Sequence, residues 1–446
     1  MKRHTSILRV GTTAMLLAAL SFPQAAGAAP AVGQADLKQP FAVTAPVVKA
    51  QPAYQDYVSR EFGIRLSGNV TRAQFAAALE KVAAAVSGNP AEQAAARNYL
   101  PQATDGSNQL AVWEAVSAAV KAAEQKELAD TYSEEKVAKA WAKAGLAYEK
   151  NGDIPFDAAR ELAAAIDLQI VSPEQLAETA DGKAGADLAY HLLGKVAEFH
   201  GAYQNYLGLI SDADIYGKLV HAWNESQIIQ AGELQQLADE VLRQDLITGY
   251  NLKDAAYDPH FDPARTITYG HSDIIHAVQL IGLLNSEGIE AKVQLEPKTS
   301  AYIYLKEWGE PVQTEDFRVV QIDNGRYIAY SKEYDLSLEF ATAEEKERFQ
   351  PLVLQYAKKN EEDAEGLLKG SWWQPLYYSL TELADYPVIT NNYLQDGRFL
   401  VQTFSLNEDS AAVAEGFRKI DDSLEVKTYT FWVDLPFYNY LQGDYK

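Results

Sequence analysis

The amino-acid sequence predicts a multi-domain protein in which an all-α region precedes an α+β region with an antiparallel sheet. The chain has 446 residues, enough for two or three domains with separate cores. From residue 54 to about 225, Ala, Glu, Lys, Leu and Gln dominate, in short amphipathic segments joined by Gly, Asn, Asp and Pro. Further along, apolar residues alternate with polar ones, and Asp-Asn-Gly separates two such runs, which is typical of a β-hairpin.

The first 28 residues have the pattern of a secretory signal peptide. Lys2, Arg3 and Arg9 form a basic start, the apolar run VGTTAMLLAALSF follows, and Ala26-Gly27-Ala28 supplies small residues before a cleavage point at Ala29. The apolar run is shorter than the ~20 residues of a membrane-spanning helix, which disfavours the alternative of an N-terminal anchor. We expect a secreted or cell-surface protein whose mature form has no membrane span.

Cysteine content and net charge limit the kinds of site and partner that this chain can have. The chain has no Cys, which excludes disulfides, thiol catalysis and Cys-ligated metal, and secretion without disulfides favours a Gram-positive source. The formal net charge is −23, and loss of the three leader cations brings it to −26. Nucleic acid is therefore not an expected partner, because phosphate binding needs a basic surface.

The chain divides into a signal peptide (1–28), an Ala/Pro/Val-rich linker (29–53), a helical region (54–225), a second domain (226–350) and an aromatic-rich C-terminal α+β part (351–446). Within the helical region, a unit of helix, loop and small-residue helix recurs weakly. Its four copies are residues 54–86, 92–123, 134–167 and 173–199.

The stretch NVTRAQFAAALEKV, residues 69–82, resembles the loop-to-helix junction of S-layer homology modules, which carry a Thr-Arg-Ala-Glu-like tetrad. Thr71 and Gln74 have the spacing of a capping box, and Arg72 lies at the helix start, where it is suited to an anionic sugar. The resemblance implies binding of a cell-wall polysaccharide through Thr71 and Arg72. The later copies have SNQLAV, PFDAAR and KAGADL at this place, without Thr-Arg, so the alternative is a plain helical region in which Thr71 only caps.

The stretch YGHSDIIHAVQLIGLLNSEGIEAKV, residues 269–293, predicts a helix that leads into a strand. Before it, residues 251–270 have little apolar period and predict a loop, whereas the segments after it predict strands. This order is similar to the transglutaminase-like (papain-related) fold, in which Gly-x-Cys opens a helix that ends in a Gly-Ile-Pro-Ala-Arg-like step. The residues at matching places are Gly270, Ser272, Asp273, Ala277, Leu284, Gly288, Ile289, Ala291 and Lys292.

The catalytic residues of the family are not matched in this chain. Ser272 stands where the family has Cys. Phe317 or Arg318 stands near the place of the His, and Ser331 or Asp335 near that of the Asp. A Ser depends on an aligned base, so the resemblance implies a domain without its transferase or protease activity.

Ser272, His271 and His276 remain the candidate catalytic residues, since His276 lies on the same helix face as Ser272. The alternative is a capped core helix, with Ser272 as N-cap, Asp273 complementing the helix dipole and Gly288 as the left-handed C-terminal residue. Asp258, His260 and Asp262 alternate in the loop, but DPHFDP lacks the Gly and distal Glu of a calcium loop. His271 and His276 are five apart rather than four, so we expect no metal site and no cofactor.

The C-terminal part contains two aromatic clusters, GSWWQPLYYS (370–379) and YTFWVDLPFYNY (429–440). They suit either a sugar-binding surface or a protein core, and the C-terminal part either forms its own domain or completes the central sheet.

Altogether we expect a non-catalytic envelope protein that binds cell-wall polysaccharide or a surface protein. The alternatives are a Ser- or metal-dependent hydrolase or transferase acting on wall peptides, and a structural helical protein without wall affinity.

Overall fold

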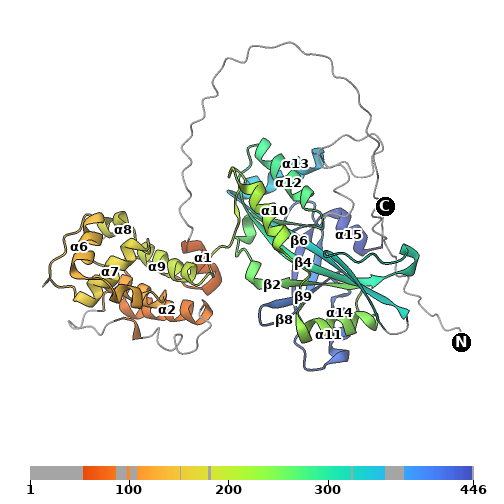
Figure 1. Cartoon of the computed structure of the whole chain (residues 1–446), viewed down its shortest axis with the longest axis horizontal. Coiled ribbons are helices and arrows are strands. Elements are labelled where there is room, and N and C mark those ends of the chain that lie inside the picture. Colours follow the sequence, from red (N-terminus) through yellow and green to blue (C-terminus); the bar gives the residue numbers. More distant parts are fainter. Residues whose placement is uncertain are drawn as a thin grey trace, which may run out of the picture.

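A computed structural model describes residues 54–86, 98–100, 108–150, 152–178, 182–322, 325–356 and 376–443. The predicted signal peptide and linker lie outside these residues. The described chain forms a helical part, drawn from red to yellow in Figure 1, and a β-barrel with helices on its outside, drawn from green to blue. The predicted combination of helices with antiparallel strands is confirmed. Among the described residues, no helix is long and apolar enough to cross a membrane.

The helical part is held together by an apolar core in which small side chains allow close helix packing. Ala115, Ala119 and Ala163 are fully buried in it beside larger residues such as Phe75 and Leu79. The helices are α1 (Tyr54–Phe62), α2 (Arg72–Val86), α4 (Val112–Ala122), α5 (Lys126–Asp130), α6 (Glu134–Lys143), α7 (Phe156–Asp167), α8 (Pro173–Glu178) and α9 (Ala186–Phe199).

Three extended segments, each just before a helix, close into a ring of backbone hydrogen bonds. The Val70 N–H donates to Ala184 O (3.0 Å), the Ala184 N–H to Leu110 O (2.9 Å) and the Leu110 N–H to Val70 O (3.4 Å). A second cyclic set joins the first helical residues to the neighbouring segments: Arg72 N–H to Asn108 O, Val112 N–H to Gly182 O, and Ala186 N–H to Gly68 O. The starts of α2, α4 and α9 are therefore fixed to one another. The segment PFDAAR, at the start of α7, lies outside this ring.

The barrel consists of eight antiparallel strands. Around the barrel, their order is β4, β2, β9, β8, β10, β7, β3 and β6, and pairing of β6 with β4 closes it. The strands are β2 (Gly249–Asp254), β3 (Thr266–His271), β4 (Ala291–Tyr304), β6 (Tyr327–Phe340), β7 (Leu376–Ser379), β8 (Val388–Asp396), β9 (Phe399–Ser405) and β10 (Lys427–Val433). Two further strands lie at its margins: β1 (Gly208–Leu209) pairs with β4, and β5 (Phe317–Gln321) pairs with β6.

The outer face of the barrel is apolar and is covered by helices. Leu336 and Leu338 on β6 and Val293 on β4 pack with residues of α10 (Ile215–Glu225), α12 (Ile274–Ser286) and α13 (Ala343–Tyr356). Another stretch of this face packs against α11 (Gly232–Arg243) and α14 (Ser410–Ile420). Because successive strand residues point to opposite faces, the residues between these apolar positions point into the barrel.

Several local expectations are confirmed. The strands on either side of Asp-Asn-Gly pair as β5 and β6, and YLQDGRFLVQTFSL forms the hairpin of β8 and β9. Gly288 follows α12 with φ +65°, as a left-handed C-terminal residue does. The C-terminal part completes the sheet of the central region, since β7 to β10 supply half of the barrel strands.

The expected loop at 251–270 is wrong at both ends, where β2 and β3 lie. Their outward residues, such as Leu252 and Ile267, are buried under helices, but their inward residues, such as Lys253 and Thr268, are polar. Such short segments with one polar face show little apolar period.

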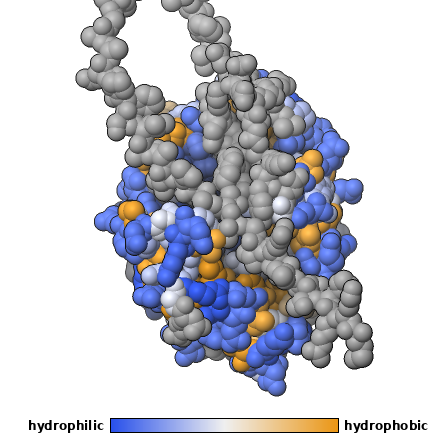
Figure 2. Space-filling view, turned by 90° about the vertical axis from the view of Figure 1, so that its right-hand side faces the viewer, coloured by the Kyte–Doolittle hydropathy of each residue, from blue (hydrophilic) through white to orange (hydrophobic). Residues whose placement is uncertain are grey.

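The face of the molecule in Figure 2 is largely hydrophilic where it is described, with small apolar patches.

Candidate functional site

The barrel interior holds a cluster of buried charges, which is the strongest candidate site in the described chain. The Lys253 Nζ lies 2.8 Å from Glu296 Oε2 and 3.0 Å from Asp335 Oδ2. The Lys298 Nζ lies 2.7 Å from Asp335 Oδ1 and 3.9 Å from Glu333 Oε2. Three strands supply these groups: β2 carries Lys253, β4 carries Glu296 and Lys298, and β6 carries both Asp335 and Glu333.

Hydroxyl groups complete the hydrogen bonding of the buried carboxylates. The Ser337 hydroxyl donates to Glu296 Oε1 (2.6 Å) and lies 3.0 Å from the Thr268 hydroxyl. The Tyr378 hydroxyl reaches Asp335 Oδ2 at 3.3 Å. A buried ion pair is stable only when its remaining lone pairs are also satisfied, and this cluster meets that condition.

The protonation behaviour of the cluster follows from burial and pairing. Burial opposes the charge of Asp335, but Lys298 and Lys253 outweigh it and hold the pKa of Asp335 at about 2. Burial also opposes the charge of Lys253, but Glu296 and Asp335 raise its pKa well above the ordinary value. Burial raises the pKa of Glu296, because this carboxylate has only one lysine partner. Asp335 is thus the permanent anion, and Glu296 is the group closer to taking up a proton.

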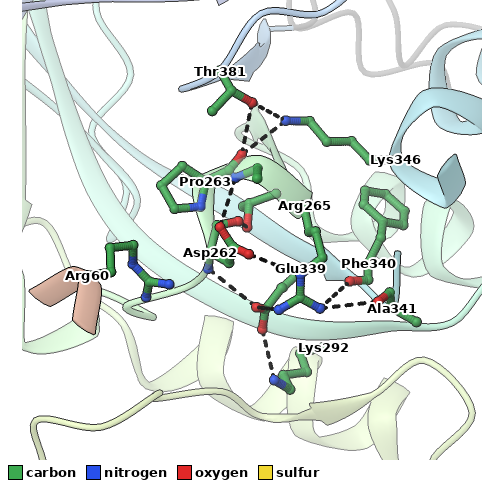
Figure 3. Close-up of polar contacts among 12 residues, drawn as sticks. Arg60, Asp262, Pro263, Arg265, Lys292, Glu339, Phe340, Ala341, Lys346 and Thr381 are labelled. Atoms are coloured by element: carbon green, nitrogen blue, oxygen red, sulfur yellow. Dashed lines mark hydrogen bonds and ion pairs between the residues drawn. The ribbon is translucent and has the colours of Figure 1, made fainter. Parts of the chain in front are cut away.

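A second charged cluster, shown in Figure 3, lies where the helical part meets the barrel. Glu339, at the end of β6, accepts hydrogen bonds from Arg265 (2.7 Å) and Lys292 (2.9 Å), and Gln204 donates to it at 3.1 Å. Gln204 precedes β1 in the connection from α9 to the barrel. The Arg60 guanidinium on α1 donates to the His260 carbonyl at 3.1 Å. These contacts fix the position of the connection, and they satisfy the buried Glu339 with two cations.

Ser272, His271 and His276 meet where β3 ends and α12 begins. The imidazole rings of His271 and His276 lie 4.2 Å apart, with His276 Nδ1 2.9 Å from His271 Nε2. The Asp273 N–H donates to His271 Nδ1 (2.9 Å). The Ser272 hydroxyl forms no hydrogen bond with either histidine, although all three residues are described.

These bonds occupy the basic nitrogens of both histidines. Because His271 Nδ1 accepts from Asp273, its Nε2 carries the proton and donates to His276 Nδ1. Neither imidazole then keeps a free lone pair for the Ser272 proton. The N-cap expectation is also corrected: the cap of α12 is Asp273, whose side chain accepts from the Ile275 N–H (2.9 Å), because the helix begins one residue later than expected.

The other loop residues considered for metal binding stabilise turns instead. Asp258 accepts from the His260 N–H, which allows His260 to hold φ +51°, and Asp262 caps the short 3₁₀ helix at Pro263–Arg265. Within the described ranges, no three His, Asp or Glu side chains are arranged to hold a metal ion.

Thr71 and Arg72 lie at the first junction of the ring in the helical part. The Thr71 N–H donates to Gln74 Oε1 (2.9 Å) and the Gln74 N–H to Thr71 Oγ1 (3.2 Å), so the predicted capping box is confirmed. The Arg72 guanidinium forms an ion pair with Glu114, the third residue of α4, and both side chains are mostly buried. Glu114 also accepts from the Ala111 N–H (3.1 Å), so the pair joins the starts of two helices.

The other residues that the sequence suggested as site residues lie in different parts of the structure. Asp335 belongs to the interior cluster, and Ser331 is buried on the same strand, whereas Phe317 and Arg318 lie on β5 at the margin of the sheet. The cluster GSWWQPLYYS lies mostly outside the described residues. In the second aromatic cluster, Phe431 and Val433 are core residues.

Lys253, Glu296 and Lys298 were not predicted as site residues from the sequence. Charged residues alternating with apolar ones in a strand usually indicate a solvent-exposed face, and here that face is the inside of a barrel. The available signal was that residues 291–304 and 327–340 form two unusually long segments in which polar residues alternate with mostly apolar ones. Comparison of the chain with protein-family models, curated proteins and solved structures finds no match.

Proposed function

We propose that this chain is a secreted, non-catalytic envelope protein that is held on the cell wall through its helical part. The observation that carries the proposal is the ring of three helix starts, with the Thr71–Gln74 capping box and Arg72 at the first of them. Such a ring is what three copies of a helix-entry unit produce when they pack around one axis. Of the four units expected from the sequence, the first, second and fourth contain the three segments of the ring, and the third does not.

Arg72 is the residue of this ring best suited to a sugar. Its guanidinium lies at the first turn of α2, and a guanidinium favours an anionic or hydroxyl-rich ligand. Its partner Glu114 holds the side chain in place. A wall polymer that binds here competes with Glu114 for the guanidinium, so the strength of the Arg72–Glu114 pair sets the affinity.

The absence of catalysis is the second element of the proposal. It is supported by the arrangement around Ser272, where the lone pairs of both histidines are already used in hydrogen bonds. A serine without an aligned base is a poor nucleophile, because its own pKa is far above neutral.

Sedimentation with purified cell-wall sacculi tests the proposal. We expect the mature chain to sediment with the sacculi, Arg72→Ala to weaken retention, and Glu114→Gln to preserve or strengthen it by releasing the guanidinium. Arg65→Ala is the matched control, since Arg65 is exposed on the same part and should leave retention unchanged.

Three results contradict the proposal in different ways. If the wild type stays in the supernatant, the helical part has no wall affinity and is structural. If Arg72→Ala binds as well as the wild type, binding does not use this junction. If soluble peptides or sugars are released from the sacculi and Ser272→Ala stops their release, the chain is an enzyme.

A further inference from the structure

A groove lies on the outside of the barrel, between the end of α12 and one face of α13. Its volume is about 560 Å³, which is within the range in which proteins bind ligands. The residues that line it are Glu287 at the end of α12 and, from α13, Glu344, Glu347, Arg348, Pro351 and Leu352. The five residues of α13 have the spacing i, i+3, i+4, i+7 and i+8, so they share one face of the helix.

The two helices that form the groove are fixed to the same side of the barrel (Figure 1). Leu352 of α13 belongs to the apolar core that also contains Leu284 of α12. The Ala341 N–H, just before α13, donates to the carbonyl of Glu290, in the turn after α12, at 3.3 Å. The groove is therefore present before a partner binds, and binding does not have to open it.

The lining of the groove is negatively charged. Among its six residues, all of which the structure describes, three are carboxylates and one is a cation, which leaves a net charge of −2. Helix α12 ends at Glu287 and directs the negative end of its dipole to this place. The start of α13 has no need of an anion, because Thr342 already accepts from the Glu345 N–H (3.2 Å). The charge of the groove therefore favours a cationic partner.

Pro351 adds a backbone acceptor and an apolar surface. It lies inside α13 and has no N–H, so the Glu347 carbonyl, four residues earlier, lacks the hydrogen bond that a helix normally gives it. Glu347 and Pro351 are both exposed and both line the groove. A donor that enters the groove can therefore bind this carbonyl as well as the carboxylate of the same residue. The Pro351 ring and Leu352 provide apolar contact beside them.

We propose that this groove is a docking site for an extended basic peptide segment of a partner protein, in which a Lys or Arg lies beside an apolar residue. Glu347 and Glu287 receive the cation, and Pro351 and Leu352 receive the apolar side chain. The eight-residue rise from Glu344 to Leu352 is roughly 12 Å, about the length of four extended residues. The site does not depend on wall retention through Arg72, and each can fail without the other.

Fluorescence anisotropy of the full mature chain with a labelled Gly-Lys-Leu-Lys-Gly peptide tests the proposal. We expect saturable binding that weakens as the salt concentration increases, and no binding of the matched Gly-Glu-Leu-Glu-Gly peptide. Gly-Lys-Ser-Lys-Gly, which lacks the apolar side chain, should bind more weakly. Putrescine has the same two positive charges without an apolar side chain, so it should displace the labelled peptide only at concentrations well above those of the unlabelled peptide.

Four variants locate the binding. Glu347→Gln should weaken it about two- to fivefold, as loss of an exposed ion pair does, and Arg348→Gln should strengthen it by a similar factor. Glu233→Gln is the matched control, because Glu233 is an exposed carboxylate on α11, away from the groove. Pro351→Ala should weaken binding and yet raise the unfolding temperature, since alanine restores the helical hydrogen bond to the Glu347 carbonyl. A purely structural role of Pro351 would not separate affinity from stability in this way.

Several outcomes overturn the proposal. The wild type does not bind the basic peptide, or it binds the acidic peptide equally well. Glu347→Gln and Glu233→Gln reduce the affinity by the same factor, which would show attraction to the net charge of the chain rather than to the groove. Putrescine displaces the labelled peptide at the same concentrations as the unlabelled peptide, which would show a site for a free diamine.

Discussion

Lys253 on β2 and Asp335 on β6 are bonded at 3.0 Å across the barrel interior, although β4 lies between their strands. The lysine reaches over Glu296 of β4, to which it is bonded at 2.8 Å. A single cation therefore joins three strands that come from distant parts of the sequence. The pairing specifies which strands are neighbours, because another strand order would leave a buried charge without a partner.

Replacement of Lys253 by Met is expected to destabilise the barrel by about 3–5 kcal/mol, because it leaves the buried carboxylates of Asp335 and Glu296 short of a cation. Methionine is an unbranched side chain of similar length, so the loss mainly reports the charge rather than the packing. Urea unfolding followed by near-ultraviolet circular dichroism measures it. Lys419→Met is the control, since Lys419 is exposed on α14. Equal stability of the two variants would show that the interior cluster does not stabilise the barrel.

Two helical glycines should respond to alanine with opposite signs. A Cβ on Gly194 of α9 would collide with the ring of Tyr54 on α1, whereas a Cβ on Gly217 of α10 meets nothing within 4 Å. Gly194→Ala must displace α1 and should cost about 1–3 kcal/mol, as overpacking does. Gly217→Ala should add about 0.5–1 kcal/mol, because it restricts the unfolded chain. Thermal unfolding of both variants checks this, and a stable Gly194→Ala would mean that α1 does not pack on α9 in solution.

The sequence predicted those elements whose signal is local. The helix at α12 has an acidic cap and a closing glycine, and the hairpins of β5–β6 and β8–β9 have Asn-Gly or Asp-Gly turns, so each could be recognised from a few adjacent residues. The capping box at Thr71 belongs to the same class. Closure of the barrel could not be predicted, because it depends on the pairing of β4 with β2 and β6 and of β9 with β2, which are distant in sequence.

The candidate site was hidden for a related reason. Asp335 stood out only through a family resemblance, and Lys253 lay in a stretch that predicts a loop. Adjacent asparagines give no local signal of this kind either: Asn392 is bonded to Ser405 and Ser410 outside the barrel, and Asn391, opposite Tyr429, points inside. Which of two adjacent asparagines points into a barrel is set by register, and register follows from tertiary pairing.

The partly buried His276 should make the protein less stable as the pH falls. Burial lowers the pKa of His276 below the ordinary 6.5, against a weaker opposing effect of Asp273. Below 6.5 the unfolded chain therefore takes up a proton before the folded chain does, and stability present above this pH is lost as the pH decreases. Burial lowers the pKa of His191 in the same direction. Urea unfolding at a series of pH values should show a smaller acid loss for His276→Gln, and His221→Gln, at an exposed position, should behave as the wild type.

The edge strand β5 is protected by a side chain that imitates a neighbouring strand. The Gln313 amide donates to Val319 O (2.8 Å) and accepts from the Val319 N–H (3.0 Å), which are the outward groups at the middle of β5. A free edge of this kind pairs readily with another chain, and pairing of two copies about Val319 would be self-complementary. Gln313→Ala should therefore shift sedimentation velocity toward a dimer as concentration increases. Gln313→Glu should do the same, because a carboxylate cannot donate to Val319 O, while Gln395→Ala, an exposed amide on β8, should not. If both Gln313 variants sediment as the wild type at every concentration, the amide is not what protects this edge.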